Sequence, residues 1–346
     1  MRRLSVIALL VVLTGMAALP VPGVAAKPSA DKAGSAMARF QRDLVNVLIL
    51  RSEAEPLLGA AMLSRTLPDV PDYANFHSLV TRAAKADDAG PGVRWAQLLD
   101  CDAEAGACPN TDALEALEKQ APDNAAVWLM VLGEAARQHD DKGSRAALAK
   151  AAAASQFDDY DGASLKALTR AAATLPPPKA LYSGKGAASS AAGVRALLVF
   201  GLGSFQPLPG FQATAALCKR HDDDKEVRAQ CLKLADTLVW GSSPLARSLG
   251  LHLISTLSDD DDARDKADAA RRDLTWQVQN FGRLTLASQR DEKVAHDLLK
   301  LAGNGGTRMS LILAALRAEG IPRQAPADWQ PHAAASAPDA DRPDAD

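Results

Sequence analysis

Apolar residues recur at helical spacing along most of this chain, and this pattern constrains the fold more than any other feature. The rows lie at residues 37–48, 73–84, 227–238, 245–257 and 309–316 and place their apolar members three or four positions apart. Alanine fills many of the positions between them, and alanine favours helix over every other structure. The sustained alternation of apolar and polar residues that marks a strand is absent. The sequence therefore predicts an all-α protein.

The charge balance and the aromatic content of the chain limit the classes of function that it can have. The 346 residues include 39 basic and 42 acidic side chains, for a formal net charge of −3, and only 4% are aromatic. A nucleic-acid-binding protein needs a basic surface, and one that binds single strands also needs aromatic side chains on which bases can stack. We therefore expect no nucleic acid partner.

The first 26 residues have the organisation of a secretory signal peptide. Arg2 and Arg3 form a positive start, residues 4–19 are mostly apolar, and Val24-Ala25-Ala26 offers a small-residue cleavage site. The apolar stretch is short for a membrane span and is followed by Pro20 and Pro22. We expect cleavage near Ala26, a periplasmic or secreted location, and no transmembrane segment in the mature chain.

Composition also divides the remainder of the chain. Residues 176–193 contain Pro176-Pro177-Pro178 followed by several Gly and Ser, which predicts a linker. This places an N-terminal helical domain at residues 27–175 and a C-terminal helical domain at 194–320. Residues 321–346 are rich in Pro, Ala and Asp without apolar periodicity, and predict a disordered tail.

A repeat signal occurs in the first of these domains. Trp95 and Trp128 are 33 residues apart, and residues 113–128 run from an apparent helix end, through Pro122, to a new helix containing Trp128. This stretch resembles the junction between two tetratricopeptide repeats, although Gly133 sits one position late for that family. The resemblance implies an α-solenoid-like stack of helical hairpins that binds segments of partner proteins. Each tryptophan sits on an apolar row, so we expect both in the core.

The four cysteines fall into two pairs that are close in sequence, Cys101/Cys108 and Cys218/Cys231. Export favours disulfides, and four cysteines allow three connectivities. Cys218 and Cys231 both face the seam of a predicted helical hairpin whose turn contains Asp222–Asp224. We expect the two local bonds. Neither pair has the spacing of a zinc site, so no metal or other cofactor is expected.

Other chemical motifs are incomplete. The acidic runs at 222–224 and 259–262 lack the alternating ligands of a calcium loop and are better interpreted as helix caps, with Ser258 preceding one helix. Likewise, Ser243 is expected to cap a helix that has Pro244 at its first position. There is no nucleophile elbow, paired-histidine motif or phosphate loop. No catalytic residue is predicted. The sequence favours a protein without enzymatic activity but does not exclude an enzyme.

These observations favour a non-enzymatic, exported helical-repeat protein that mediates protein–protein interaction in the cell envelope. Glu134 and Arg137 lie away from the apolar row of Trp128, so we expect them to meet the protein partner, whose identity the sequence does not give. Two alternatives remain. One is an envelope hydrolase or accessory subunit whose site residues converge from several helices, and the other is a binder of a small apolar ligand.

Overall fold

The computed structural model describes residues 28–101, 109–183 and 188–331. Within these ranges the chain forms 15 α-helices and two short 3-10 helices, with no β-strand, so the predicted all-α class is confirmed. The expected signal peptide, residues 1–26, lies outside the described residues.

Most helices that follow one another in sequence are also neighbours in space, as in α1 on α2, α2 on α3, α6 on α7, α11 on α12 and α12 on α13. The bounds are α1 (Pro28–Leu48), α2 (Ala54–Ser64), η1 (Asp72–Ala74), α3 (Phe76–Lys85), α4 (Pro91–Gln97), α5 (Thr111–Gln120), α6 (Ala125–Arg137), α7 (Asp141–Ala153), α8 (Asp161–Ala173), η2 (Lys179–Leu181), α9 (Ala191–Leu202), α10 (Phe211–Arg220), α11 (Lys225–Leu238), α12 (Pro244–Leu257), α13 (Asp261–Ala287), α14 (Glu292–Gly303) and α15 (Arg308–Ala318).

Side-chain caps fix where many of these helices begin. The acidic runs provide two of them: Asp224 accepts hydrogen bonds from the first turn of α11, and Asp260 does so for α13. This confirms that the runs cap helices, although Asp260 occupies the cap position of α13, and Ser258 Oγ accepts instead from the Asp260 backbone at 3.2 Å. Ser243 precedes Pro244 at the start of α12 as expected, but its side chain makes no capping hydrogen bond.

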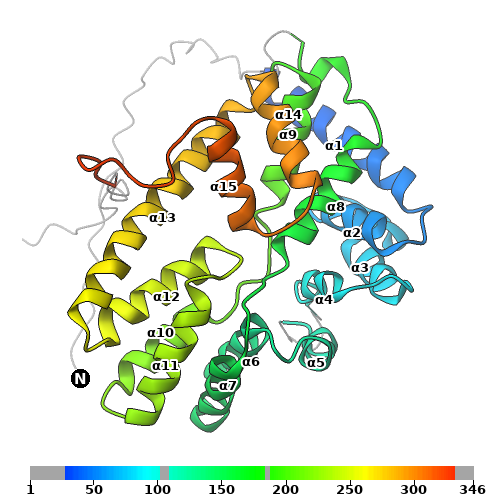
Figure 1. Ribbon diagram of the computed structural model, residues 1–346. Coiled ribbons are helices and arrows are strands. Elements are labelled where there is room, and N and C mark those ends of the chain that lie inside the picture. The colour runs from blue at the N-terminus through cyan, green and yellow to red at the C-terminus, as the bar shows by residue number, and fades with distance from the viewer. Residues whose placement is uncertain (1–27, 102–108, 184–187, 332–346) are drawn as a thin grey trace, which may run out of the picture.

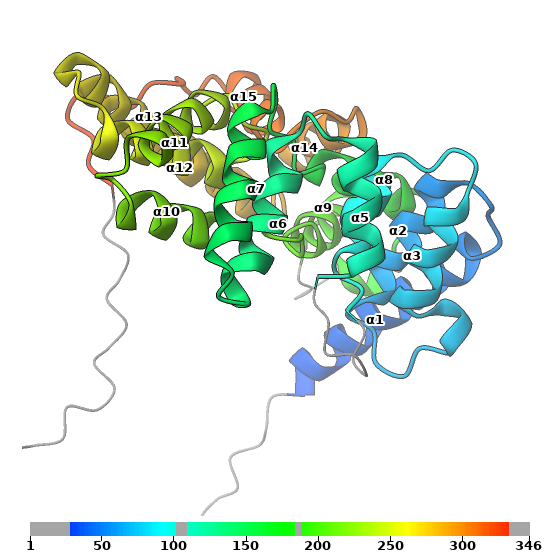
Figure 2. The ribbon, with the colours of Figure 1, turned by 90° about the horizontal axis from the view of Figure 1, so that it is seen from below.

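Two hydrophobic cores hold the helices together. The first is built mainly from α1, α2, α3, α8, α9 and α13 to α15, and the second mainly from α5 to α7 and α10 to α12, with α4 contributing to both. Figure 1 shows how the chain returns on itself, because α14 lies against α8 and α9 rather than at the far end of an open array. Figure 2 shows the α6/α7 hairpin between α10 and α5.

The segment 176–193, expected to be a linker, does not separate these cores. Its prolines end α8, but η2 then packs against α1 and α9 with Leu181 buried, and α9 packs back on α8. Each core consequently draws helices from both sides of the segment. A proline run stops a helix without preventing the next helix from packing on the previous one. Residues 184–187 lie outside the described residues.

Residues 321–331, expected to begin a disordered tail, pack along α13. Trp276 Nε1 donates to the carbonyl of Pro322 at 2.8 Å, and Asp273 accepts from the backbone N–H of Ala325 at 2.9 Å. The rings of Trp276 and Trp329 meet edge to face with centroids 5.4 Å apart. Aromatic and hydrogen-bonded contacts therefore order a segment that lacks apolar periodicity. The rest of the expected tail, residues 332–346, lies outside the described residues.

Candidate functional site: an apolar groove beside α6 and α10

An apolar groove with a volume of about 710 Å³ lies between α6, the loop that precedes α10, and the start of α12. We call it the α6–α10 groove. Two of its leucines are strongly exposed, Leu208 at 66% and Leu245 at 54%. Exposed aliphatic side chains that gather around a hollow mark binding surfaces more often than single exposed ones do. The apolar walls include Leu98, Leu99, Met130, Pro209, Phe211 and Leu245.

Glu134 and Arg137, the two residues expected to meet a partner, both line this groove. They form an ion pair with each other on α6, and Gln138 Nε2 donates to Glu134 Oε1 at 2.7 Å. Glu134 is half-buried and Arg137 is exposed. The helix thus presents a charged edge to an otherwise apolar groove.

The groove owes its shape to two glycines that let the backbone approach closely. Gly210 N donates to the carbonyl of Leu129 at 2.9 Å, so the loop before α10 is pinned to α6. A Cβ on Gly210 would lie 2.7 Å from the Cα of Gly133, a distance that real Cβ atoms essentially never show. Glycine is therefore needed at position 210, whereas a Cβ on Gly133 would lie 3.1 Å from the Cα of Gly210, a tight contact that needs only a small shift. Gly133, which lies one position late for the tetratricopeptide pattern, is the residue of α6 that Gly210 approaches in this contact.

A disulfide anchors the far end of α10. Cys218 and Cys231 are bonded, with their Cα atoms 6.0 Å apart, and both side chains are buried. This confirms the local pairing predicted from the sequence and ties α10 to α11. The other expected bond includes Cys108, which lies outside the described residues.

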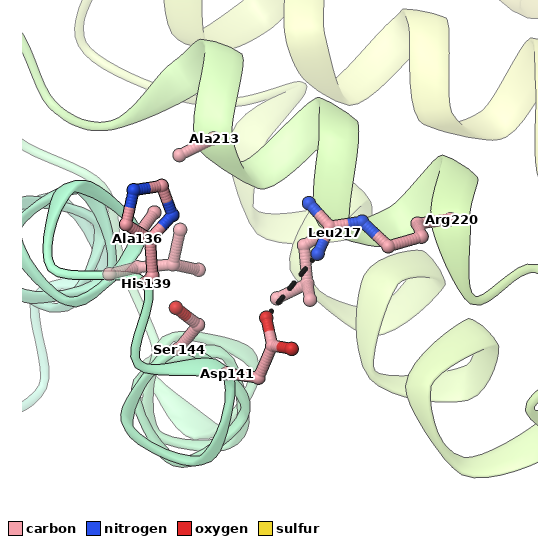
Figure 3. Close-up of a pocket in the computed structure, with 8 residues that line it drawn as sticks. Ala136, His139, Asp141, Ser144, Ala213, Leu217 and Arg220 are labelled. Carbon is pink, nitrogen blue, oxygen red and sulfur yellow. Dashed lines mark hydrogen bonds and ion pairs between the residues drawn. The ribbon is translucent and has the colours of Figure 1, made fainter.

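A smaller cleft of about 180 Å³ lies between the α6/α7 hairpin and α10 (Figure 3). Ser144, His139 and Asp141 line it, which are the residue types of a nucleophilic triad. No hydrogen bond joins their side chains within the described ranges. Figure 3 shows that Asp141 turns toward Arg220, with 3.3 Å between Oδ1 and Nη1, and that the His139 ring lies away from this pair. The cleft does not assemble a nucleophile and a base.

A polar junction joins the two cores, and we define it as Asn124, Asp158, Asp159, Asp161 and Ser242. The buried Asn124 side chain donates to the Asp158 carbonyl at 2.7 Å and accepts from its N–H at 2.9 Å. Ser242 Oγ donates to Asp159 Oδ1 at 2.7 Å. Burial raises the pKa of Asp158, and burial also raises that of Asp161, to about 6, against the lowering effect of Arg308. The Asp159 and Asp161 carboxylates thus link segments that are distant in sequence, whereas the Asp158 carboxylate accepts from Tyr160 N within its own turn.

Trp95 and Trp128 are both buried, as predicted. Trp128 Nε1 donates to the carbonyl of Pro122 at 2.7 Å, and Lys150 Nζ lies 4.1 Å from the centre of its indole. The tryptophans therefore belong to the scaffold behind the groove. Leu208 and Leu245 were missed as site residues, because Leu208 lies outside any helical row and Leu245 begins a row that otherwise predicts core.

Comparisons with protein-family models, with curated proteins and with solved structures find no significant match to this chain. The helices of the described residues include none that is long and apolar enough to cross a bilayer. Among the same residues, no group of three or more His, Cys, Asp or Glu side chains is placed to hold a metal ion.

Proposed function

We propose that this protein is a non-enzymatic binding protein of the cell envelope, and that its α6–α10 groove receives an apolar segment of another protein. The observation that carries the proposal is the groove itself, a hollow of about 710 Å³ whose lining includes the exposed Leu208 and Leu245. A bound segment that covers these leucines removes apolar surface from water. Each Å² of apolar surface buried in this way stabilises the complex by about 25 cal/mol.

A segment that fits this groove is short, adopts an extended or a helical conformation, and carries aliphatic or aromatic side chains on one face. A charged or polar residue beside that face would meet the Glu134–Arg137 pair at the groove edge. Charges in such positions act more on association rate and on choice of partner than on affinity.

The structural details favour binding over hydrolysis. The cleft that holds Ser144, His139 and Asp141 lacks the hydrogen bonds that activate a nucleophile. The carboxylates of the polar junction already have partners: Asp158 accepts from Tyr160 N within its own turn, while Ser242 on Asp159 and Arg308 on Asp161 link distant segments.

The envelope location is supported by two independent features. Residues 1–26 have the order of a signal peptide. The Cys218–Cys231 disulfide is of a kind that persists in oxidising compartments and is rare in the cytosol. Fractionation followed by N-terminal sequencing tests this part, and a chain that keeps Met1 in the cytoplasm would contradict it.

The binding proposal is tested by photo-cross-linking with a benzophenone side chain at Leu208. The matched control is Leu286 on α13, which is exposed to the same degree, 67% against 66%, and does not line the groove. We expect a partner protein to be captured from Leu208 and not from Leu286. Leu245→Asp should abolish that capture, and the new carboxylate is tolerated in the fold because it lies in the first turn of α12.

Equal capture from both positions, or capture unaffected by Leu245→Asp, would overturn the assignment of the groove. Turnover of an envelope substrate, lost on substituting Ser144 or His139, would overturn the non-enzymatic proposal.

A further inference from the structure

A second apolar groove lies between the end of α11, α12 and the first half of α13, and α12 therefore contributes to both grooves. We call it the Trp240 groove. Its volume is about 500 Å³, within the usual range for sites that hold small molecules. Trp240 lines it and is 81% exposed, the largest exposed aromatic side chain among the described residues. Its aliphatic walls are Leu251, Ile254, Ala267, Ala270 and Leu274.

Two cations line the same groove without a carboxylate partner in the described part of the chain. Arg247 is half-buried, and its guanidinium donates through Nε to the carbonyl of Gly241 at 2.9 Å. Burial lowers its pKa, which reflects the cost of keeping this charge partly out of water. Lys266, one helix away on α13, is exposed and forms no ion pair with any residue that the structure describes.

One acidic residue, Asp273, also lines the groove, and its Oδ1 accepts from the backbone N–H of Ala325 at 2.9 Å. Asp236 belongs to a neighbouring cavity that shares Trp240. The charges of the groove itself are therefore two cations and one carboxylate that is already hydrogen-bonded, which leaves an excess of positive charge beside an aliphatic floor.

We propose that the Trp240 groove binds an anionic amphiphile, a small molecule with an aliphatic chain and a carboxylate head group. The chain covers the leucine, isoleucine and alanine side chains and packs against the exposed face of Trp240. The carboxylate lies between Arg247 and Lys266.

Charge complementarity selects this occupant over others. An uncharged chain would cover the aliphatic floor but would bury Arg247 further without pairing it, and burial of an unpaired charge is costly. A cationic amphiphile would add repulsion from both side chains. A second copy of this chain would have to bring an acidic apolar surface to the groove, and that outcome is distinguished below.

The test titrates the full mature protein with dodecanoate and, in parallel, with dodecyltrimethylammonium, both below the concentrations at which they form micelles. Binding is followed by calorimetry and by tryptophan fluorescence, with Trp240→Phe used to isolate the signal of Trp240. We expect saturable binding of dodecanoate that shifts the Trp240 emission to shorter wavelength. The cationic chain should bind at least about tenfold more weakly.

Lys266→Glu tests the charge at an exposed position where folding is not at risk, and Arg247→Gln tests the half-buried one. Each should weaken dodecanoate binding by about two- to fivefold, the effect of removing one partly solvated ion pair. Lys119→Glu on α5, an exposed lysine outside both grooves, is the matched control and should leave the affinity unchanged.

Three outcomes would overturn the proposal. One is equal affinity for the anionic and the cationic chain, and another is no saturable binding of dodecanoate. The third is concentration-dependent self-association that buries Trp240 and that dodecanoate does not disrupt, which would assign the groove to a second copy of the chain.

Discussion

The Asp161 carboxylate and the Arg308 guanidinium form an ion pair that joins the first residue of α8 to the first residue of α15. Their side chains are only 7% and 17% exposed. Arg308 also donates to the carbonyl of Gly203 at 3.1 Å, so a single guanidinium connects α15 to α8 and to the end of α9. Asp161 itself belongs to the polar junction that joins the two hydrophobic cores.

Protonation of Asp161 gives the first prediction. Burial raises the pKa of Asp161 from 3.8 to about 6, although Arg308 opposes the shift. The folded state therefore holds this proton more tightly than the unfolded state does. The contribution of Asp161 to stability is greatest below pH 4, falls as the pH rises toward 6, and is constant above that. Asp161→Asn should lose this dependence, which denaturant unfolding between pH 4 and 7 would reveal.

Arg308→Met is the companion variant for that experiment. Because Arg308 lowers the pKa of Asp161, its removal should push the pKa higher and extend the pH-dependent window above 6. At neutral pH the variant should unfold more easily by about 3–5 kcal/mol, since it leaves a buried carboxylate without its partner. A pH profile identical to that of the unmodified protein would refute the assignment.

The Cys218–Cys231 bond gives the second prediction. The two cysteines are 13 residues apart, and closing a loop of this size stabilises the folded state by roughly 3 kcal/mol in the chain-entropy model. Replacing both cysteines with alanine should lower the free energy of unfolding by about that amount and loosen α10, one wall of the groove. Equilibrium denaturation measures the first effect, and hydrogen exchange in residues 211–220 measures the second. Equal exchange in both proteins would mean that the bond does not hold α10.

Local structure was the most predictable part of this fold. The apolar rows at 227–238 and 245–257 coincide with α11 and α12, because periodic burial and alanine content act within a single helix. The apolar row at 73–84 matches the helix bounds of the structure less well. Its first member, Tyr73, lies in η1 and is 62% exposed, since Asn75 caps α3 and starts that helix at Phe76.

Contacts between distant segments were not predictable in this way. Asp161 and Arg308 are 147 residues apart, and neither belongs to a motif. The approach of Gly210 to Gly133 likewise depends on how two helices meet. The same limitation applies to the candidate site: the sequence placed Glu134 and Arg137 off the apolar row, but only the packing of α10 and α12 creates the groove beside them. Leu245 begins a core row in sequence and is exposed in the fold.

The Glu134–Arg137 pair gives the third prediction. Glu134→Arg combined with Arg137→Glu preserves an ion pair on α6 with its polarity reversed. The free energy of unfolding should change by less than about 1 kcal/mol, because exposed pairs contribute little. Association with the groove partner should change in rate at low ionic strength, and the difference should shrink in high salt. Unchanged association rates and salt dependence would remove these residues from the interface.

Arg272 on α13 gives the last prediction. Its guanidinium donates to four backbone carbonyls of the C-terminal segment, at Ala325 (3.4 Å), Pro326, Ala327 (3.1 Å) and Trp329 (2.7 Å). It also lies 5.7 Å from the centre of the Trp329 ring. One side chain thus converges on a stretch of five residues. Arg272→Ala should release residues 325–329 while α13 stays folded, because that helix keeps its own backbone hydrogen bonds and its packing on α12.

Hydrogen exchange measured by mass spectrometry checks this prediction directly. We expect the exchange rate in residues 325–329 to rise by at least about tenfold, because that is the effect of losing one charge-assisted hydrogen bond. Arg271→Ala is the matched control, because Arg271 is the adjacent residue and its guanidinium lies 3.7 Å from the exposed Asp268 carboxylate rather than on the C-terminal segment. Arg272→Lys should also release the segment, since an ammonium group lacks the planar fork that reaches several carbonyls at once. Equal acceleration in Arg271→Ala would attribute the effect to α13 as a whole, and no acceleration in Arg272→Ala would show that the Trp276–Trp329 contact suffices.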